Sequence, residues 1–242
     1  MKKYTKKLKL NILSSRLQDY RLYHYFIKRC LDYNTGDSQY EAFLGYLRDE
    51  ITENFKNKNN KEKDKIIKEI LTRERKRLDK LIRYNLRQIK EEWPKICPSF
   101  VDICEKKFDG CPFPEGKYTA IMTIWGRYPY IKSKKIIYFP AHKDWMLFVI
   151  IHELLHLVFF NFYTHYCKDI QLSKDNLWEL SEVLDVLVMN EEPYLKWVKM
   201  QSQPYPAHRK NYELLLPFFK ERKSMHSFIA EASKILNKQG SP

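Results

Sequence analysis

Two histidines and a glutamate stand together in the segment His152-Glu153-Leu154-Leu155-His156. On an α-helix, residues four apart lie on one face, one turn apart, so both imidazoles can reach a single metal ion. Neutral imidazoles suit zinc, and a catalytic zinc site adds a third protein ligand and a water. Glu153 lies next to the first histidine, from where it can act as general base on that water.

The residues around this segment make a metal the better explanation of its polar side chains. Apolar pairs fill the neighbouring positions, namely Ile150-Ile151, Leu154-Leu155 and Leu157-Val158. Burial of two histidines and a glutamate without partners would cost several kcal/mol. A metal ion supplies the missing partner, so we expect one bound zinc ion.

The segment at 152–156, followed by a helix that bears glutamates, resembles the zincin metallopeptidases, and within them the gluzincin branch typified by thermolysin. The resemblance covers roughly residues 117–190 and leaves the first hundred residues outside it. It implies a third zinc ligand that is a glutamate on the second helix. It also implies an edge strand that binds extended substrate beside the active-site helix, for which 118–125 is the candidate. The metzincins need a third histidine six residues after His156, where this chain has Phe162.

Two glutamates compete for the place of third ligand. Glu182 lies deeper in an apolar run than Glu179 and needs a charge partner more, so Glu182 is preferred and Glu179 is the alternative. Asp185 is expected to accept a hydrogen bond from the outer N–H of a ligating histidine. Both glutamates follow His156 at a longer spacing than is usual in gluzincins. His165 is a weaker alternative ligand, beyond the helix.

A gluzincin also needs a hydrogen-bond donor for the developing oxyanion. Tyr205, His208 and Tyr212 are the candidates, chosen by residue type from the loop after the second helix. His142 precedes the first helix and is expected to be a loop or capping residue.

The pattern of helices and strands expected from the sequence predicts an α+β fold that is predominantly helical. In it, a small mixed sheet lies beside a central helix that carries the HExxH motif. Asp144 and Ser173 are the expected N-caps of the two site helices, and Ser38 with Glu41 forms a capping box. Trp93-Pro94 is expected to end a long helix. Periodicity predicts helices at 14–33, 38–55, 62–92, 144–162, 174–190, 210–220 and 224–237, strands at 118–125 and 136–139, and irregular chain at 97–116.

Charge divides the chain into a basic and a nearly balanced part. Residues 1–98 carry 25 Lys and Arg against 14 Asp and Glu, and the whole chain has a net charge of +14. We therefore expect a basic helical region, 1–98, that packs on a zincin-like domain, 99–242. A basic field attracts nucleic acid, anionic membrane or acidic partners, but no nucleic-acid-binding motif accompanies it.

The N-terminus lacks the apolar core of a signal peptide. The most apolar window, 145–163, contains three ionisable groups, which predicts a buried helix and no membrane span. The five cysteines lack paired CxxC spacing and are expected to be reduced thiols in a cytoplasmic protein.

These features together predict a cytoplasmic, zinc-dependent metallopeptidase that acts on peptide or protein substrates. A toxin-like intracellular protease with one protein target is a variant of the same hypothesis. The alternative is a catalytically weak zinc-binding protein whose basic helices bind nucleic acid or a protein partner. Glu153 distinguishes the two, because a purely structural zinc site has no use for a carboxylate beside its ligand.

Overall fold

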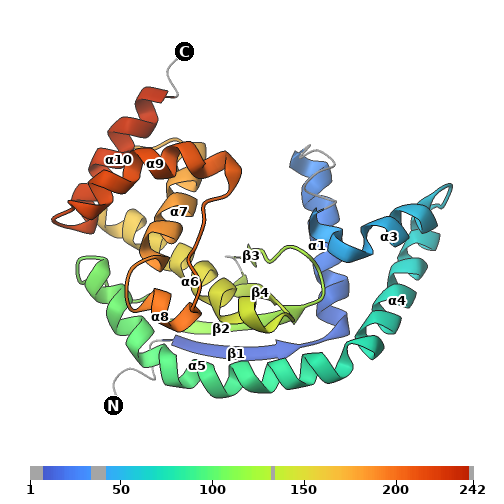
Figure 1. The fold of residues 1–242 in the computed structure, drawn as a ribbon. Coiled ribbons are helices and arrows are strands. Elements are labelled where there is room, and N and C mark those ends of the chain that lie inside the picture. Colours follow the sequence, from blue (N-terminus) through green and yellow to red (C-terminus); the bar gives the residue numbers. More distant parts are fainter. Residues whose placement is uncertain (1–7, 34–41, 132–133, 240–242) are drawn as a thin grey trace. The chain divides into compact units, whose positions relative to one another are not determined.

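The computed structural model describes residues 8–33, 42–131 and 134–239 (Figure 1). It confirms the predicted class, α+β and predominantly helical with a small mixed sheet. The main elements of the described part are β1 (Leu8–Ser14), α1 (Arg16–Tyr33), α3 (Arg48–Phe55), α4 (Asn60–Arg77), α5 (Asp79–Lys107), β2 (Gly116–Thr123), β3 (Tyr130–Ile131), β4 (Ile136–Pro140), α6 (Lys143–Tyr166), α7 (Lys174–Met189), α8 (Tyr194–Val198), α9 (Arg209–Lys220) and α10 (Met225–Gln239).

The chain forms two compact units, and neither is a continuous segment. The first unit comprises Met1–Lys9, Pro94–Gly116 and Ile151–Pro242, and the second comprises Leu10–Trp93 and Lys117–Ile150. Helices α5 and α6 each pass from one unit into the other. The boundary expected after residue 98 falls inside α5, and the division into 1–98 and 99–242 stays a prediction.

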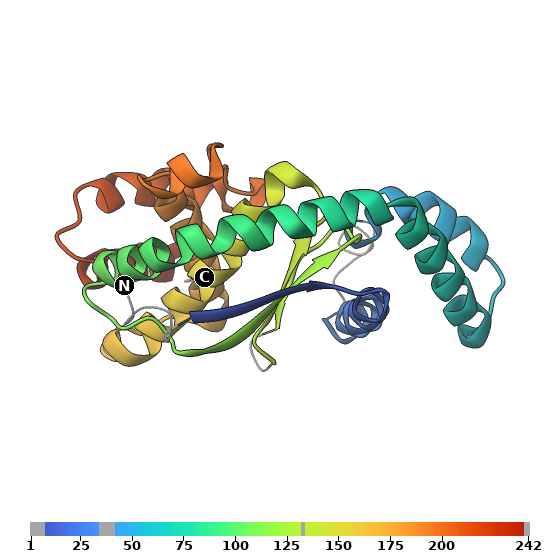
Figure 2. The same ribbon diagram turned by 90° about the horizontal axis from the view of Figure 1, so that it is seen from below.

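The sheet belongs almost entirely to the second unit, and its strands lie in the order β1-β2-β4-β3. Strand β2 pairs with β4 in parallel, whereas the two-residue strand β3 pairs with β4 antiparallel. Figure 2 shows β1, in dark blue, leading directly into α1. The expectation that 118–125 forms an edge strand is wrong, because β2 has a neighbour on each side.

A buried ion pair joins α1 and α4 to the sheet within the second unit. Asp19 is fully buried and accepts hydrogen bonds from Arg75 Nε at 2.5 Å and from Thr123 Oγ1 at 2.7 Å. The indole N–H of Trp125 donates to the Asp19 carbonyl at 2.9 Å. Burial raises the pKa of Asp19, while the positive charge of Arg75 and the hydrogen bonds from Thr123 and Arg75 act in the opposite direction. We call these four residues the Asp19 cluster.

The long helix expected at 62–92 is two helices. Helix α4 starts after Asn59, which forms a capping box with Glu62, and ends at Arg77 with Leu78 as its C-cap, before α5 begins. Helix α5 then continues through Pro94 and Pro98 to Lys107, so the predicted stop at Trp93-Pro94 and the irregular chain at 97–107 are wrong. Burial explains the continuation, because Trp93, Phe100 and Val101 are at most 3% exposed and hold the helix by packing.

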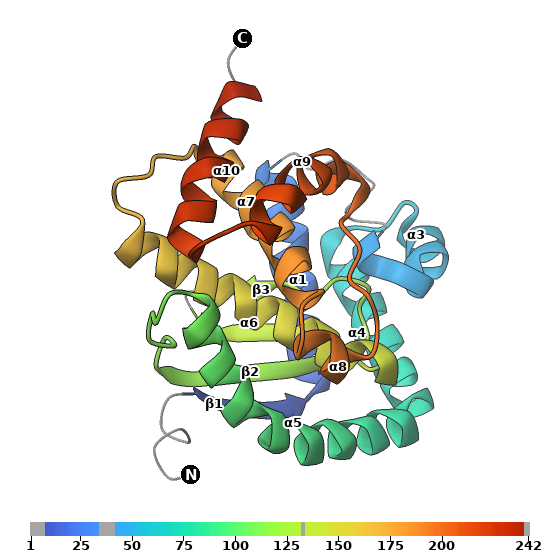
Figure 3. The same ribbon diagram turned by 60° about the vertical axis from the view of Figure 1, so that its left-hand side comes forward.

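Helices α7, α9 and α10 pack on one another in the first unit (Figure 3). Helix α7 begins as predicted, because the Ser173 side chain accepts a hydrogen bond from the Asn176 amide. Helix α8 was not predicted. Helix α6 already starts at Lys143, so Asp144 lies in its first turn and is not the N-cap.

Helix α6 is the one helix in the described ranges that is long and apolar enough to cross a membrane, by length and composition alone. Its most apolar window is 67% buried. A buried core helix passes the same test.

The four cysteines whose side chains are described, Cys97, Cys104, Cys111 and Cys167, are free thiols. Cys104 lies 3.4 Å from the Tyr194 hydroxyl. The side chain of Cys30 and the capping box expected at Ser38 and Glu41 lie outside the described residues. The region expected to be helical at 14–33 is strand β1 up to Ser14 and helix α1 from Arg16.

Candidate metal centre

Helix α6 carries both histidines on one face, as the four-residue spacing predicts. The apolar residues beside them are fully buried, namely Ile150, Ile151, Leu154 and Leu155. Packing of these side chains in the core therefore also buries the residues of the motif. His156 is 3% exposed and Glu153 is 9% exposed. The Nε2 atoms of His152 and His156 lie 3.2 Å apart.

Glu182 on α7 completes a set of three donors with the two Nε2 atoms. Its Oε1 lies 3.5 Å from His156 Nε2, and its Oε2 lies 3.8 Å from His152 Nε2. Ligand atoms about 2.0–2.1 Å from a shared tetrahedral zinc lie roughly 3.3 Å from one another. The three spacings lie within about 0.5 Å of that value, so the residues present fit a tetrahedral metal ion.

Asp185 lies one turn further along α7, on the Nδ1 side of the same rings. Its Oδ2 is 3.0 Å from His156 Nδ1 and 3.8 Å from His152 Nδ1. His152, His156 and Asp185 also satisfy the spacing of a metal-binding group. We favour Glu182 as the ligand, because its oxygens face the two closely spaced Nε2 atoms and leave Asp185 to accept from Nδ1. Outer carboxylates of this kind commonly orient zinc-bound histidines.

Glu179, the alternative third ligand, is engaged elsewhere. Its Oε2 lies 2.5 Å from His208 Nδ1, and its Oε1 accepts from Asn211 Nδ2 at 2.7 Å. The structure therefore brings Glu182, and not Glu179, to the two histidines. His165 is also away from the cluster, since its Nδ1 lies 2.8 Å from the Asn161 carbonyl one turn earlier on α6.

Burial sets the protonation of the cluster. It lowers the pKa of His152 to about 4, and burial together with neighbouring His152 lowers the pKa of His156 well below its usual value. Both imidazoles are thus neutral at pH 7, the form that binds a metal. Burial, and then the charge of Glu182, raises the pKa of Glu153, and burial followed by Glu182 and Glu153 raises the pKa of Asp185.

The cluster contains polar atoms that the protein does not satisfy. His156 Nδ1 and both Asp185 carboxylate oxygens are buried and meet the geometry of no hydrogen bond among the described residues, although Nδ1 and Oδ2 lie only 3.0 Å apart. Three carboxyl groups, those of Glu153, Glu182 and Asp185, crowd two neutral imidazoles. A divalent cation would balance this charge and order the rings, so the residues present fit a metal ion. We call these five residues the histidine–carboxylate cluster.

The three candidate oxyanion donors differ in their surroundings. His208 is held by Glu179, on the turn of α7 that precedes Glu182, and its side chain is 17% exposed. Tyr205 is 52% exposed and its ring meets that of His208 edge-on. Within the described part of the chain, no hydrogen bond, ion pair or ring contact joins Tyr212 to the cluster. His142 is an exposed residue 4.0 Å from Asp144, outside the cluster.

Sequence reasoning missed two aromatic neighbours of the cluster. The Trp178 ring stacks on the His156 imidazole with centroids 5.5 Å apart, although Trp178 is 48% exposed. Phe160, four residues after His156 on α6, stacks more loosely at 6.4 Å. The spacing of Phe160 could have revealed its contact, whereas the contact of Trp178 joins two helices and has no local signal.

Comparison of the chain with protein-family models, with curated proteins and with solved structures gave no match.

Proposed function

We propose that this chain is a zinc-dependent metallopeptidase that hydrolyses peptide bonds in protein or peptide substrates in the cytoplasm. The observation that carries the proposal is the convergence of two Nε2 atoms and the Glu182 carboxylate at spacings of 3.2, 3.5 and 3.8 Å. His152, His156 and Glu182 are the proposed ligands. Zinc in this position would lower the pKa of a water to about 7 and polarise the scissile carbonyl.

Glu153 is the proposed general base. It follows the first ligand on α6, is 9% exposed, and lies close enough to Glu182 for that charge to raise its pKa. It would take a proton from the attacking water and deliver it to the leaving amine. Water is largely excluded from its surroundings, which strengthens each of these interactions.

His208 is the proposed oxyanion donor. The contact between its Nδ1 and Glu179 fixes the ring, so Nε2 is the atom left to face a substrate oxygen. The pair therefore gives Glu179 a positioning role in place of the ligand role that sequence reasoning considered for it.

Metal content tests the ligand set. Purified wild type should carry one zinc per chain by inductively coupled plasma mass spectrometry. Glu182→Ala should lose it, whereas the matched control Glu179→Ala, one turn away on the same helix, should keep it. If Glu182→Ala keeps its zinc and Asp185→Ala loses it, the metal binds on the Nδ1 side of the two imidazoles, with Asp185 as its ligand. Absence of zinc from the wild type even after reconstitution would refute the proposal.

Hydrolysis tests the role of Glu153. Glu153→Gln should keep zinc and the fold but cleave an unfolded protein or a fluorogenic peptide library about 10²–10⁴ times more slowly, the usual contribution of a general base. Glu213→Gln, an exposed change on α9, is the matched control and should leave the rate unchanged. Equal rates in Glu153→Gln and wild type would favour the catalytically weak, purely zinc-binding alternative.

A further inference from the structure

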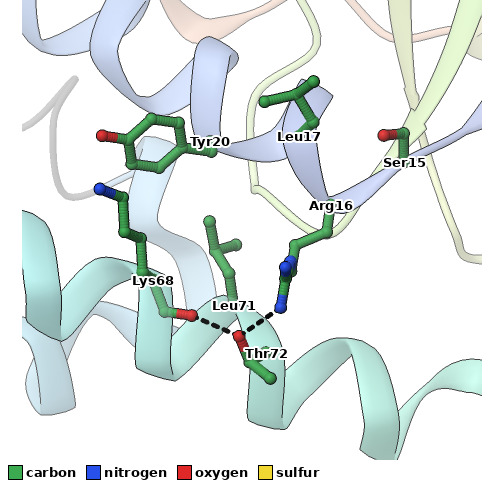
Figure 4. A pocket seen from close by; sticks show the side chains of 7 residues that line it. All are labelled: Ser15, Arg16, Leu17, Tyr20, Lys68, Leu71 and Thr72. Atoms are coloured by element: carbon green, nitrogen blue, oxygen red, sulfur yellow. Dashed lines mark hydrogen bonds between the residues drawn. The ribbon is translucent and has the colours of Figure 1, made fainter.

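A groove of about 480 Å³ lies between the start of α1 and one face of α4, wholly inside the second unit (Figure 4). Arg16 and Lys68 stand on its two walls, Leu71 contributes apolar surface, and Thr72 and Tyr20 add hydroxyl groups. None of the described residues that line it is acidic. The hydroxyl of Tyr20 donates to Asp64 and that of Thr72 to the Lys68 carbonyl, so the groove presents chiefly the positive charges of Arg16 and Lys68.

Arg16 is held in place by a neutral group. It donates to Thr72 Oγ1 at 2.7 Å, and Thr72 in turn donates to the Lys68 carbonyl at 2.6 Å (Figure 4). Arg16 forms no ion pair with any carboxylate in the described ranges. Its guanidinium is thus fixed on α4 by a hydroxyl, and no carboxylate of the described ranges pairs with its charge, a state that suits the binding of an external anion.

Lys68 has a partner that it can exchange. Its Nζ lies 2.7 Å from Asp64, one turn earlier on α4, and 5.0 Å from the centre of the Tyr20 ring. The lysine side chain is 58% exposed. Exposed pairs of this kind contribute at most about 1 kcal/mol, so a ligand that brings its own negative charge can compete with Asp64 for Lys68.

A second hollow continues the first along α4. It has a volume of about 490 Å³, shares Lys68 and Thr72 with the groove, and is also lined by Lys65, Glu69, Arg73 and Lys76. Arg73 is committed to Glu50 and Lys65 to Glu69, but Lys76 has no ion pair within the described chain. Lys65 and Lys76 are about 16 Å apart along the helix axis, from the 1.5 Å rise per residue.

This length favours a ligand with repeated negative charges over a single anion. A nucleic-acid strand carries a phosphate at every 3.4 Å of duplex axis, so about 16 Å meets several successive phosphates. An anionic membrane fits less well, because membrane-surface helices insert apolar side chains beside their basic residues. Among the described residues, α4 exposes no large hydrophobic side chain, and the lining of the groove exposes one, Leu17 on α1, at 53%.

We propose that the hollow formed by Arg16, Lys65, Lys68, Thr72 and Lys76, the α1–α4 groove, binds the phosphate backbone of nucleic acid without reading its sequence. Arg16 and Lys76 supply charge that pairs with no described carboxylate, Lys68 exchanges Asp64 for a phosphate, and Thr72 holds Arg16 in position. The site is independent of the histidine–carboxylate cluster, so neither proposal depends on the other.

The test is fluorescence anisotropy of the full chain with labelled single strands and duplexes of about 20 nucleotides, over a series of salt concentrations. Wild type should bind with a dissociation constant in the micromolar range, and the logarithm of the affinity should fall linearly with the logarithm of salt concentration. R16Q/K76Q should reduce that slope by about 1–2, one unit or less per lost phosphate contact. K168Q/K196Q, with the same loss of charge in the first unit, should leave the slope unchanged.

A second variant tests the groove without removal of a cation. Thr72→Glu places a carboxylate between Arg16 and Lys68 and should weaken binding about tenfold. Thr164→Glu is its matched control, since Thr164 is an exposed helical threonine that donates to the carbonyl four residues earlier, as Thr72 does. Circular dichroism should show all variants folded.

Three results would overturn the proposal. They are absence of nucleic-acid binding by the wild type at about 50 mM salt, equal losses in the matched controls, and binding to phosphatidylserine vesicles without binding to nucleic acid.

Discussion

Each unit of this molecule buries a cluster of charged and polar side chains, and the two clusters are satisfied in different ways. In the Asp19 cluster, the carboxylate meets a guanidinium at 2.5 Å and a hydroxyl at 2.7 Å. In the histidine–carboxylate cluster, three carboxyl groups meet two neutral imidazoles, and three buried atoms of His156 and Asp185 find no hydrogen bond among the described residues. The buried carboxylate of the first cluster has protein partners, whereas the second cluster has the donor set that we propose for a metal ion.

We use this difference to distinguish a structural polar cluster from a proposed site for a ligand. Buried charges persist in folded proteins when they are paired or bind metals. Residue types alone do not distinguish the two cases, since both clusters contain buried carboxylates. Arg75 pairs with the carboxylate of the Asp19 cluster, whereas the five residues of the histidine–carboxylate cluster include no lysine or arginine.

The largest expected effect is a difference in stability between two variants, each of which lacks the aspartate of one cluster. Asp19→Ala leaves Arg75, 12% exposed, without its partner and should lower the free energy of unfolding by about 3–5 kcal/mol. Asp185→Ala, in metal-free protein, removes a carboxyl that Glu182 and Glu153 repel and should change stability by less than about 1 kcal/mol. Urea unfolding in the presence of a chelator measures both. Equal losses would mean that Asp185 has a structural partner.

Zinc should act on one cluster alone, with a somewhat smaller effect. At about 1,000 times its dissociation constant, zinc should raise the free energy of unfolding of the wild type by about 4 kcal/mol, because it binds the folded state. His156→Ala should show no such gain. Magnesium is the control ion, since it prefers oxygen ligands in octahedral geometry and should not stabilise either protein. Stabilisation of His156→Ala by zinc would place the metal elsewhere.

The smallest expected effect concerns the thiols, which belong to neither cluster. Burial raises the pKa of Cys97 to about 11 and of Cys104 and Cys167 to about 12. The thiolate is the reactive form, so iodoacetamide at pH 8 should modify native Cys97 roughly 10² times and native Cys104 and Cys167 roughly 10³ times more slowly than the unfolded thiols, and all of them faster as pH rises. Mass spectrometry should find these rates unchanged by zinc. Protection by zinc would mean that a cysteine binds the metal.

Local signals in the sequence predicted the elements whose chemistry is local. The four-residue step between His152 and His156, the cap at Ser173 and the β-branched runs near Ala120 and Ile137 each depend on neighbours in the chain, and the structure has the corresponding elements. The continuation of α5 past Pro94 was missed, because the local effect of proline is outweighed by burial of side chains that come later in the helix.

Distant partners explain the rest of what the sequence did not reveal. The competition between Glu179 and Glu182 is decided by His208, 29 residues after Glu179, which engages Glu179. Lysines next to strand β1 in the sequence obscure its alternation of apolar and polar residues. Only its place beside β2 in the sheet identifies it as a strand. Long-range contacts of this kind leave no periodic pattern in one sequence.

The interleaving of the two units has a consequence for the order in which the chain can fold as it is synthesised. The second unit has all of its segments once the ribosome has passed Ile150, just before the first histidine of the motif. The first unit gains its last described helix, α10, only after Met225–Gln239. Domains generally fold as they emerge, at about 5–20 residues per second. For several seconds the nascent chain therefore holds a complete second unit, while the apolar second half of α5 waits for its partners.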